Sequence, residues 1–131
     1  MGVQLNHTIV FCSDQAASSS FFADVLGLPA PRRFSHFHVV DMQNNASLDF
    51  MQQDGKIALQ HYAFLVSEAE FDAIFGRIQA RGLTYWADPA RTQPGQINRH
   101  FGGRGMYFED PNGHFLEIIT TPYGEISAYD D

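Results

Sequence analysis

Cysteine is almost absent from this chain, since Cys12 is the only one among 131 residues. A single cysteine cannot form an internal disulfide, which excludes the disulfide-rich scaffolds of small secreted domains. The first seven residues contain no basic segment followed by a long apolar run, so their pattern differs from that of a secretory signal. We therefore expect a cytoplasmic protein in a reducing compartment.

Positive charge is also scarce. The chain has 8 Lys and Arg against 15 Asp and Glu, which gives a formal net charge of −7. A protein that binds nucleic acid or a membrane surface through phosphates needs a basic face, and no Lys/Arg cluster is present. No apolar stretch approaches the roughly 20 residues that span a bilayer. These absences exclude nucleic acid and membrane as expected partners and favour a small molecule.

Apolar side chains are abundant, by contrast. Hydrophobic residues make up 44% of the chain, aromatic residues 14% and charged residues only 18%, a composition typical of a folded protein with a buried core. The length suits one domain, or two small modules that share a core. We therefore treat residues 1–131 as a single domain.

The chain consists of two similar halves. The first begins with a strand-like segment at residues 5–11, followed by a helix that Ser13 or Asp14 can cap and that Gly27 ends. The second begins with a strand-like segment at residues 60–66, followed by a helix with a capping box at residues 67–70 and a glycine stop at Gly82. Further strands are expected within residues 34–40, 46–51, 106–108 and 115–120.

A unit of this size cannot cover both faces of its sheet, so two such units are expected to combine. The sequence thus predicts an α+β fold in which two βαβββ modules, at about residues 5–53 and 58–122, form a curved mixed sheet around a cleft. Coincidental similarity between two common strand-helix units is the alternative. Within the second half, residues 87–105 contain several Pro and Gly and show no hydrophobic periodicity. Such a segment indicates a functional or a mobile loop.

Four polar residues occupy equivalent places in the two halves. His7 and His61 lie in the opening strands, and Asp49 and Glu117 lie in late strands with apolar neighbours. Taken singly, a strand histidine is more often a hydrogen-bonded core residue, and a carboxylate can pair with an arginine or face water. Together, two imidazoles with one or two carboxylates match a metal site, including the arrangement of non-haem Fe(II) oxygenases.

The segment at residues 105–117, in which the turn Asp110-Pro111-Asn112-Gly113 leads to Glu117, resembles the vicinal oxygen chelate superfamily. That group includes glyoxalase I, fosfomycin-resistance enzymes, bleomycin-resistance proteins and extradiol ring-cleaving dioxygenases. The resemblance extends over residues 5–122. It implies the glyoxalase/dioxygenase-like fold around a divalent ion, with His7, His61 and Glu117 as ligands. Asp49 lies near the place of a fourth ligand, which glyoxalase I fills with the longer glutamate.

Two further residues match the signature of extradiol dioxygenases. His100 and Tyr107 precede the Asp-Pro turn in the order in which those enzymes have a histidine and an aromatic hydroxyl, so the resemblance implies acid/base and hydrogen-bonding roles for them. Extradiol enzymes commonly have two module pairs and a further active-site histidine, and this chain has neither. His100 can equally be an exposed loop residue, and Tyr107 a core aromatic.

Two other polar residues have an open interpretation. Arg104, between two glycines, can meet an anionic substrate or pair with a surface acid. His114 follows the turn directly, and we expect it to be exposed.

Three functions follow from this interpretation. The first is a metal-dependent enzyme that acts on vicinal oxygens, narrowly favoured as an extradiol dioxygenase of a catechol-like compound. The second is a glyoxalase-type lyase or isomerase, favoured if Asp49 binds the ion, and the third is a metal-free, bleomycin-resistance-type binding protein. The expected cofactor is a divalent metal, with Fe²⁺ or Mn²⁺ favoured and Zn²⁺, Ni²⁺ or Co²⁺ also compatible. The resemblance further implies a homodimer.

Overall fold

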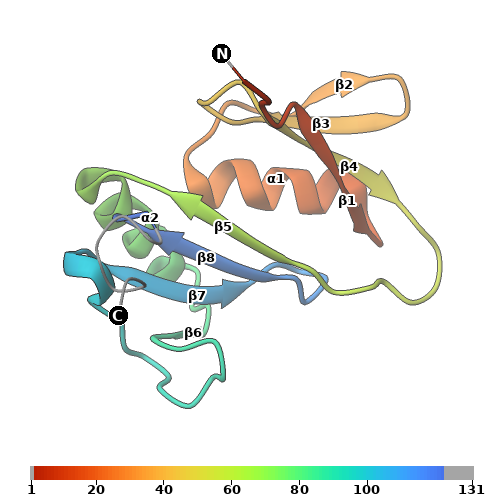
Figure 1. The fold of residues 1–131 in the computed structure, drawn as a ribbon. Helices are drawn as coiled ribbons and strands as arrows, with labels where there is room; N and C mark the ends of the chain where they lie inside the picture. The colour runs from red at the N-terminus through yellow and green to blue at the C-terminus, as the bar shows by residue number, and fades with distance from the viewer. Residues whose placement is uncertain (1, 123–131) are drawn as a thin grey trace. The chain divides into compact units, whose positions relative to one another are not determined.

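The structure is a computed structural model that describes residues 2–122 (Figure 1). Its elements are β1 (His7–Cys12), α1 (Gln15–Leu26), β2 (Arg32–Phe34), β3 (Phe37–Asp41), β4 (Ser47–Gln52), β5 (His61–Leu65), α2 (Glu68–Ala80), β6 (Tyr85–Trp86), the 3₁₀ turn η1 (His100–Gly102), β7 (Gly105–Glu109) and β8 (Phe115–Ile119). Each half has the order βαβββ, so the predicted α+β fold of two βαβββ modules is confirmed. Among the described residues, no helix has the length and apolar composition that crossing a membrane requires.

The strands form two four-stranded mixed sheets, in the orders β1-β4-β3-β2 and β5-β8-β7-β6. In each sheet the first pair is parallel and the other pairs are antiparallel. The chain divides into two compact units. One contains residues up to Leu59 together with Asp110–Asn112, and the other contains Gln60–Glu109 and the residues from Gly113 onward.

In the first unit, local sequence signals set the ends of α1. The Asp14 side chain accepts a hydrogen bond from the backbone N–H of Ala17 at 3.0 Å, and Gly27 ends the helix in the left-handed region at φ 71°. The buried residues of α1 pack on the sheet, where the rings of Phe22 and Phe50 meet edge-on at 4.9 Å. The predicted helix and both its signals are therefore confirmed.

The segment predicted as one strand over residues 34–40 is a hairpin instead. The chain turns at Ser35, whose φ of 55° lies in the left-handed region, and so β2 and β3 run antiparallel. The guanidinium of Arg32 binds both carboxylate oxygens of Asp41 across this hairpin, at 2.7 and 3.1 Å. The pairing keeps the pKa of Asp41 below its usual range.

In the second unit, the predicted capping box of α2 is present. The Ser67 hydroxyl accepts from the Glu70 N–H at 3.1 Å, and the Glu70 carboxylate accepts from the Ser67 N–H at 2.7 Å. The loop at residues 87–105 is tied to the sheet at two points, because Trp86 bridges to Pro94 and Asn98 bridges to Gly105. The two-residue strand β6 was not predicted, since it is too short to show a periodicity.

The second sheet has two chemically different faces. Leu116 and Ile118 of β8 are fully buried, and by register they share a side of the sheet with Tyr85. The ring of Tyr85 meets that of Phe75 in α2 at 5.1 Å, so α2 covers this side. The backbone of α2 lies against the sheet in Figure 1. Strand alternation places Glu117 and its neighbours on the opposite side. We call this side the Glu117 face. By register it presents His61, Ala63, Leu65, Trp86, Gly105, Tyr107, Glu109, Phe115, Glu117 and Ile119.

Candidate functional site

The centre of the Glu117 face is a histidine–carboxylate pair. Ala63 is the register partner of Glu117, so His61, two residues earlier in β5, lies diagonally across from the carboxylate. His61 Nε2 lies 3.1 Å from Glu117 Oε1. Glu117 is only 1% exposed, and a carboxylate in such a place requires a partner.

The other nitrogen of His61 decides what that partner can be. Nδ1 lies 2.9 Å from the carbonyl oxygen of Phe115, which can only accept, so Nδ1 carries a proton. In a neutral imidazole, Nε2 then directs a lone pair at the carboxylate oxygen. His61 Nε2 and Glu117 Oε1 are stable at 3.1 Å only if a cation lies between them. That cation is either a proton or a metal ion.

This donor set fits a divalent metal ion. Histidine ligands in metal sites usually donate their second ring N–H to a carbonyl or carboxylate, as His61 does. Imidazole nitrogen and carboxylate oxygen are ligands that iron, manganese, nickel, cobalt and zinc all accept. Within the part of the chain that the structure describes, no group of three or more His, Cys, Asp or Glu side chains gathers to hold an ion, so the two-residue pair is what the second unit supplies.

The first sheet has a histidine and a carboxylate in the same register. His7 pairs with Ser47 and Ile9 pairs with Asp49, just as His61 pairs with Phe115 and Ala63 with Glu117. The contacts differ, however. Asp49 is 8% exposed and its Oδ1 accepts from the Ser47 hydroxyl at 2.8 Å, while His7 Nδ1 lies 2.7 Å from Asn6 Oδ1.

The structure treats the two candidate acid/base residues differently. Tyr107 is 7% exposed, is the register partner of Glu117, and its ring stacks on Phe115 at 5.2 Å and on His61 at 6.2 Å. His100 is exposed at the start of η1, and its ring contacts that of Phe101 at 6.3 Å. The structure thus groups Tyr107 with His61 and Glu117, and it gives His100 no contact with that group.

Two residues near the pair were not assigned to the site from the sequence. The rings of Trp86 and Phe115 lie 6.1 Å apart, and the guanidinium carbon of Arg91 lies 4.0 Å above the Phe115 ring. Trp86 precedes the irregular loop and Arg91 lies within it, so no periodic pattern marked them. The single signal was an arginine two residues after a proline, in a loop for which the sequence indicates either a functional or a mobile segment.

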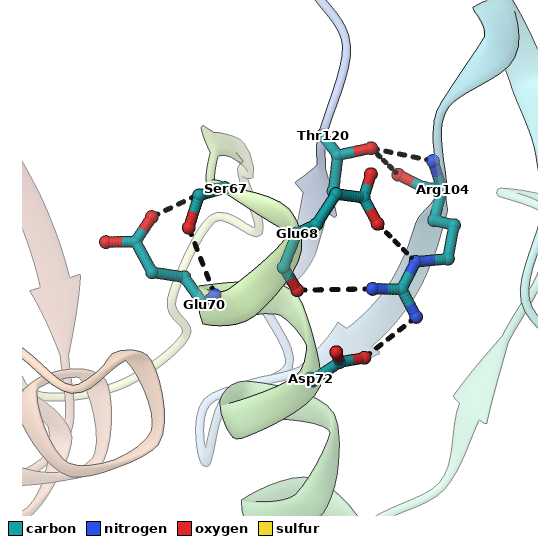
Figure 2. Close-up of polar contacts among 6 residues, drawn as sticks. All are labelled: Ser67, Glu68, Glu70, Asp72, Arg104 and Thr120. Carbon is teal, nitrogen blue, oxygen red and sulfur yellow. Dashed lines mark hydrogen bonds and ion pairs between the residues drawn. The ribbon is translucent and has the colours of Figure 1, made fainter.

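The guanidinium of Arg104 binds residues of helix α2 (Figure 2). Its Nε lies 2.7 Å from Glu68 Oε1, its Nη1 lies 2.9 Å from Asp72 Oδ1, and its guanidinium covers the Phe71 ring at 4.3 Å. The hydroxyl of Thr120 and this guanidinium lower the pKa of Glu68, and the Asp72 carboxylate raises the pKa of Arg104. Of the two interpretations of Arg104, pairing with surface acids is the observed one.

The expectation that His114 is exposed is wrong. Its side chain is fully buried, its Nδ1 accepts a hydrogen bond from the Gln60 N–H at 3.0 Å, and its ring meets that of Tyr62 edge-on. The strand alternation of β8, extended by one residue, places His114 on the same side as Leu116. It therefore fixes the backbone directly before His61.

Comparison with known proteins gives the family. The family model described as the glyoxalase/bleomycin resistance protein/dioxygenase superfamily matches residues 4–118. The structure called oxidase ChaP-H1 is similar with a TM-score of 0.92 and 58% identity, covering 94% of this chain and 99% of that one. The glutathione transferase FosA of Serratia marcescens is 29% identical over 87% of this chain and 78% of that protein. The metallothiol transferase FosB of Shouchella clausii is 26% identical over 95% of this chain and 85% of that protein. With its fold and most of its length matched, the chain belongs to the glyoxalase/bleomycin resistance protein/dioxygenase superfamily.

Proposed function

We propose that this protein is a metal-dependent enzyme that oxidises a small molecule with two adjacent oxygens, favoured as an extradiol-type dioxygenase of a catechol-like compound. The observation that carries the proposal is the buried Glu117 carboxylate, whose Oε1 lies 3.1 Å from His61 Nε2 while His61 Nδ1 donates to the Phe115 carbonyl. The names of two similar structures, oxidases ChaP-H1 and ChaP-H2, at 58% and 59% identity, support oxidation over other chemistry of the superfamily.

The proposed ligands are His7, His61 and Glu117, which leave coordination positions for the substrate and for oxygen. A divalent cation there, Fe²⁺ or Mn²⁺ by preference, supplies Lewis-acid stabilisation of the two substrate oxygens. The Phe115 carbonyl holds the His61 ring in the tautomer that binds a cation through Nε2.

Two further residues act on the substrate in this proposal. Tyr107, stacked beside His61, donates a hydrogen bond from its hydroxyl to a substrate oxygen. His100, exposed at the end of the loop, accepts a catechol proton on an imidazole nitrogen.

Oxygen uptake with a panel of catechols tests the proposal. The protein is purified without oxygen, loaded with Fe(II) and mixed with each catechol in an oxygen electrode, beside metal-free protein and Glu117→Gln protein. We expect uptake of one O₂ per ring opened, with both oxygen atoms in the product, by the loaded native protein alone. An absence of uptake across the panel would remove this function.

A second candidate is a glyoxalase-type lyase or isomerase. Asp49 favours it, because the register gives Asp49 the place in the first sheet that Glu117 has in the second. Against it, Asp49 is one methylene shorter and already accepts from Ser47. Conversion of a hemithioacetal by nickel- or zinc-loaded protein, without oxygen uptake, would select this candidate.

We also propose that the protein is a cytoplasmic homodimer. The side chains of Ile9 and Phe11 on β1 are 36% and 38% exposed, and apolar side chains exposed together are typical of association surfaces. Light scattering at micromolar concentration is expected to give twice the chain mass, and a monomer mass would contradict the dimer.

A further inference from the structure

Arg91 lies one aromatic ring away from the histidine–carboxylate pair. Its guanidinium carbon is 4.0 Å from the centre of the Phe115 ring and 5.5 Å from that of Trp86. Phe115 is also the register partner of His61, and the two rings lie 6.0 Å apart. Phe115 therefore contacts the guanidinium and the candidate metal ligand at once.

Hydrogen bonds to Asp88 in the loop before β7 hold Arg91 in this position. The carboxylate of Asp88 accepts from the N–H groups of Thr92 and Gln93, at 3.0 and 2.9 Å, and from the Thr92 hydroxyl. These bonds close residues 88–93 into a tight turn and hold Arg91 at φ 61°, in the left-handed region. An arginine is strained there by roughly 1 kcal/mol or more, and such strain is found most often at functional sites.

The resting partner of Arg91 leaves donors for a ligand. Nε and Nη2 both lie near the same oxygen of Glu109, at 3.1 and 3.0 Å, so the pair is not matched at both oxygens and Nη1 takes no part in it. Each side chain is 41% exposed. An exposed ion pair of this kind contributes little and exchanges easily for another anion.

The guanidinium of Arg91 is a positive charge on a chain that is negatively charged overall. The chain has a net charge of −7, which repels an anionic ligand at long range. Arg104, another guanidinium of this unit that lies over an aromatic ring, is held by Glu68 and Asp72. Arg91 is thus a cation that lies over the Glu117 face, one ring away from the candidate ligands.

We infer that Arg91 determines specificity by binding an anionic oxygen of the substrate, a carboxylate or an ionised phenol, which lies beyond the two vicinal oxygens. This inference rests on the proposed function and narrows its substrate class to acidic aromatic compounds. In the complex, the substrate anion replaces Glu109 on the guanidinium, and the rings of Phe115 and Trp86 contact the aromatic part.

Matched pairs of charged and neutral aromatic probes test the inference. With metal-loaded protein the pair is 3,4-dihydroxybenzoate and 4-methylcatechol, and with metal-free protein in EDTA it is 2-naphthoate and 2-naphthamide. Binding is followed by calorimetry and by the fluorescence of Trp86, which is the only tryptophan of the chain. Each probe is titrated into the native protein, Arg91→Gln and Glu109→Gln, with thermal unfolding as a check on folding.

We expect the native protein to bind the charged probe of each pair about tenfold more tightly than the neutral one. Arg91→Gln should bring the two probes of a pair to within about twofold, with binding of the neutral probe unchanged. Glu109→Gln breaks the same ion pair but keeps the cation, so it should retain or increase the preference. If Arg91 only fastened its loop, both variants would behave alike, and this result would overturn the inference.

The two probe pairs separate this inference from the proposed function. A preference for naphthoate that depends on Arg91, without metal-dependent binding of either catechol, supports the inference and contradicts the proposed function. Metal-dependent catechol binding without a charge preference supports the proposed function and contradicts the inference. Binding of neither pair overturns both.

Discussion

Each sheet has a histidine and a carboxylate in the same register, but the two carboxylates have different contacts. Glu117 meets His61 Nε2 directly, whereas Asp49 is one methylene shorter and its Oδ1 accepts from the Ser47 hydroxyl. In the first sheet the neighbour of the carboxylate is therefore a hydroxyl, and in the second it is an imidazole. This difference favours three protein ligands over four, which is the arrangement that leaves room for oxygen.

The metal content of two carboxamide variants tests this assignment. Glu117→Gln should lose the bound metal, because the neutral amide replaces the anionic ligand that lies beside His61 Nε2. Asp49→Asn should retain it. Glu109→Gln is the matched control, since Glu109 lies on the same face and is 41% exposed. Loss of metal in Asp49→Asn, measured by elemental analysis of folded protein, would favour the four-ligand, glyoxalase-type site.

The thiol of Cys12 gives a second prediction for a single residue. Burial raises its pKa above the ordinary value of 9.0, more than its hydrogen bond with Ser18 lowers it. The native thiol should therefore stay protonated at pH 8 and react with a disulfide reagent only as fast as the protein opens. Rapid stoichiometric labelling of the native protein would contradict this, and labelling in denaturant serves as the control.

The same shift has a consequence for stability. A thiol whose pKa is raised by folding ionises more easily in the unfolded chain, so its contribution is complete below about pH 9 and decreases as the pH rises beyond it. Cys12→Ala should lessen this alkaline loss of stability, as measured by thermal unfolding between pH 8 and 10.

At the scale of elements, helix α2 has a cluster of polar contacts at its start (Figure 2). Ser67 and Glu70 close the capping box, while Arg104 joins the first turn to β7 through Glu68 and Asp72. This fixes α2 against the side of the sheet opposite the Glu117 face.

Ser67→Ala should lower the free energy of unfolding by about 1 kcal/mol, because it leaves a helix N–H without its acceptor. Ser20→Ala in α1 is the control, since Ser20 is an exposed residue in the helix interior, and it should change stability little. Chemical denaturation measures both. An equal effect of the two substitutions would contradict a capping role.

How far the elements could be predicted depends on how local their signals are. The ends of both helices were predicted, because Asp14, Gly27 and Ser67 act within four residues of their partners. The turn at Ser35 was not, since a serine in the left-handed region has no sequence mark comparable with glycine. The burial of His114 was missed because the strand alternation was not extended back across the turn.

The candidate site was predictable to the same degree. His61 and Glu117 were found from the repeat and the Asp-Pro turn, and the structure brings them into contact. Arg91 could not be found in this way, because its place over Phe115 depends on a turn that Asp88 holds through three hydrogen-bond donors. His7 and His100 remain predictions.

The described part of the chain contains one module twice, and each module has one histidine and one carboxylate in the same register. Two protein ligands are too few to hold a divalent ion firmly, since stable sites have three or more. Each module alone is therefore incomplete, and we expect one ion per chain rather than two.

Elemental analysis of protein purified without oxygen or chelators measures this stoichiometry. One ion per chain is expected for the native protein, and close to none for His7→Ala as well as for Glu117→Gln, because each removes a different ligand of the same site. His36→Ala is the control, since His36 is exposed in the turn between β2 and β3 and should keep the full content. Two ions per chain, with each variant losing only one, would show instead that the modules bind metal independently, and a full ion in His7→Ala would remove His7 from the ligand set.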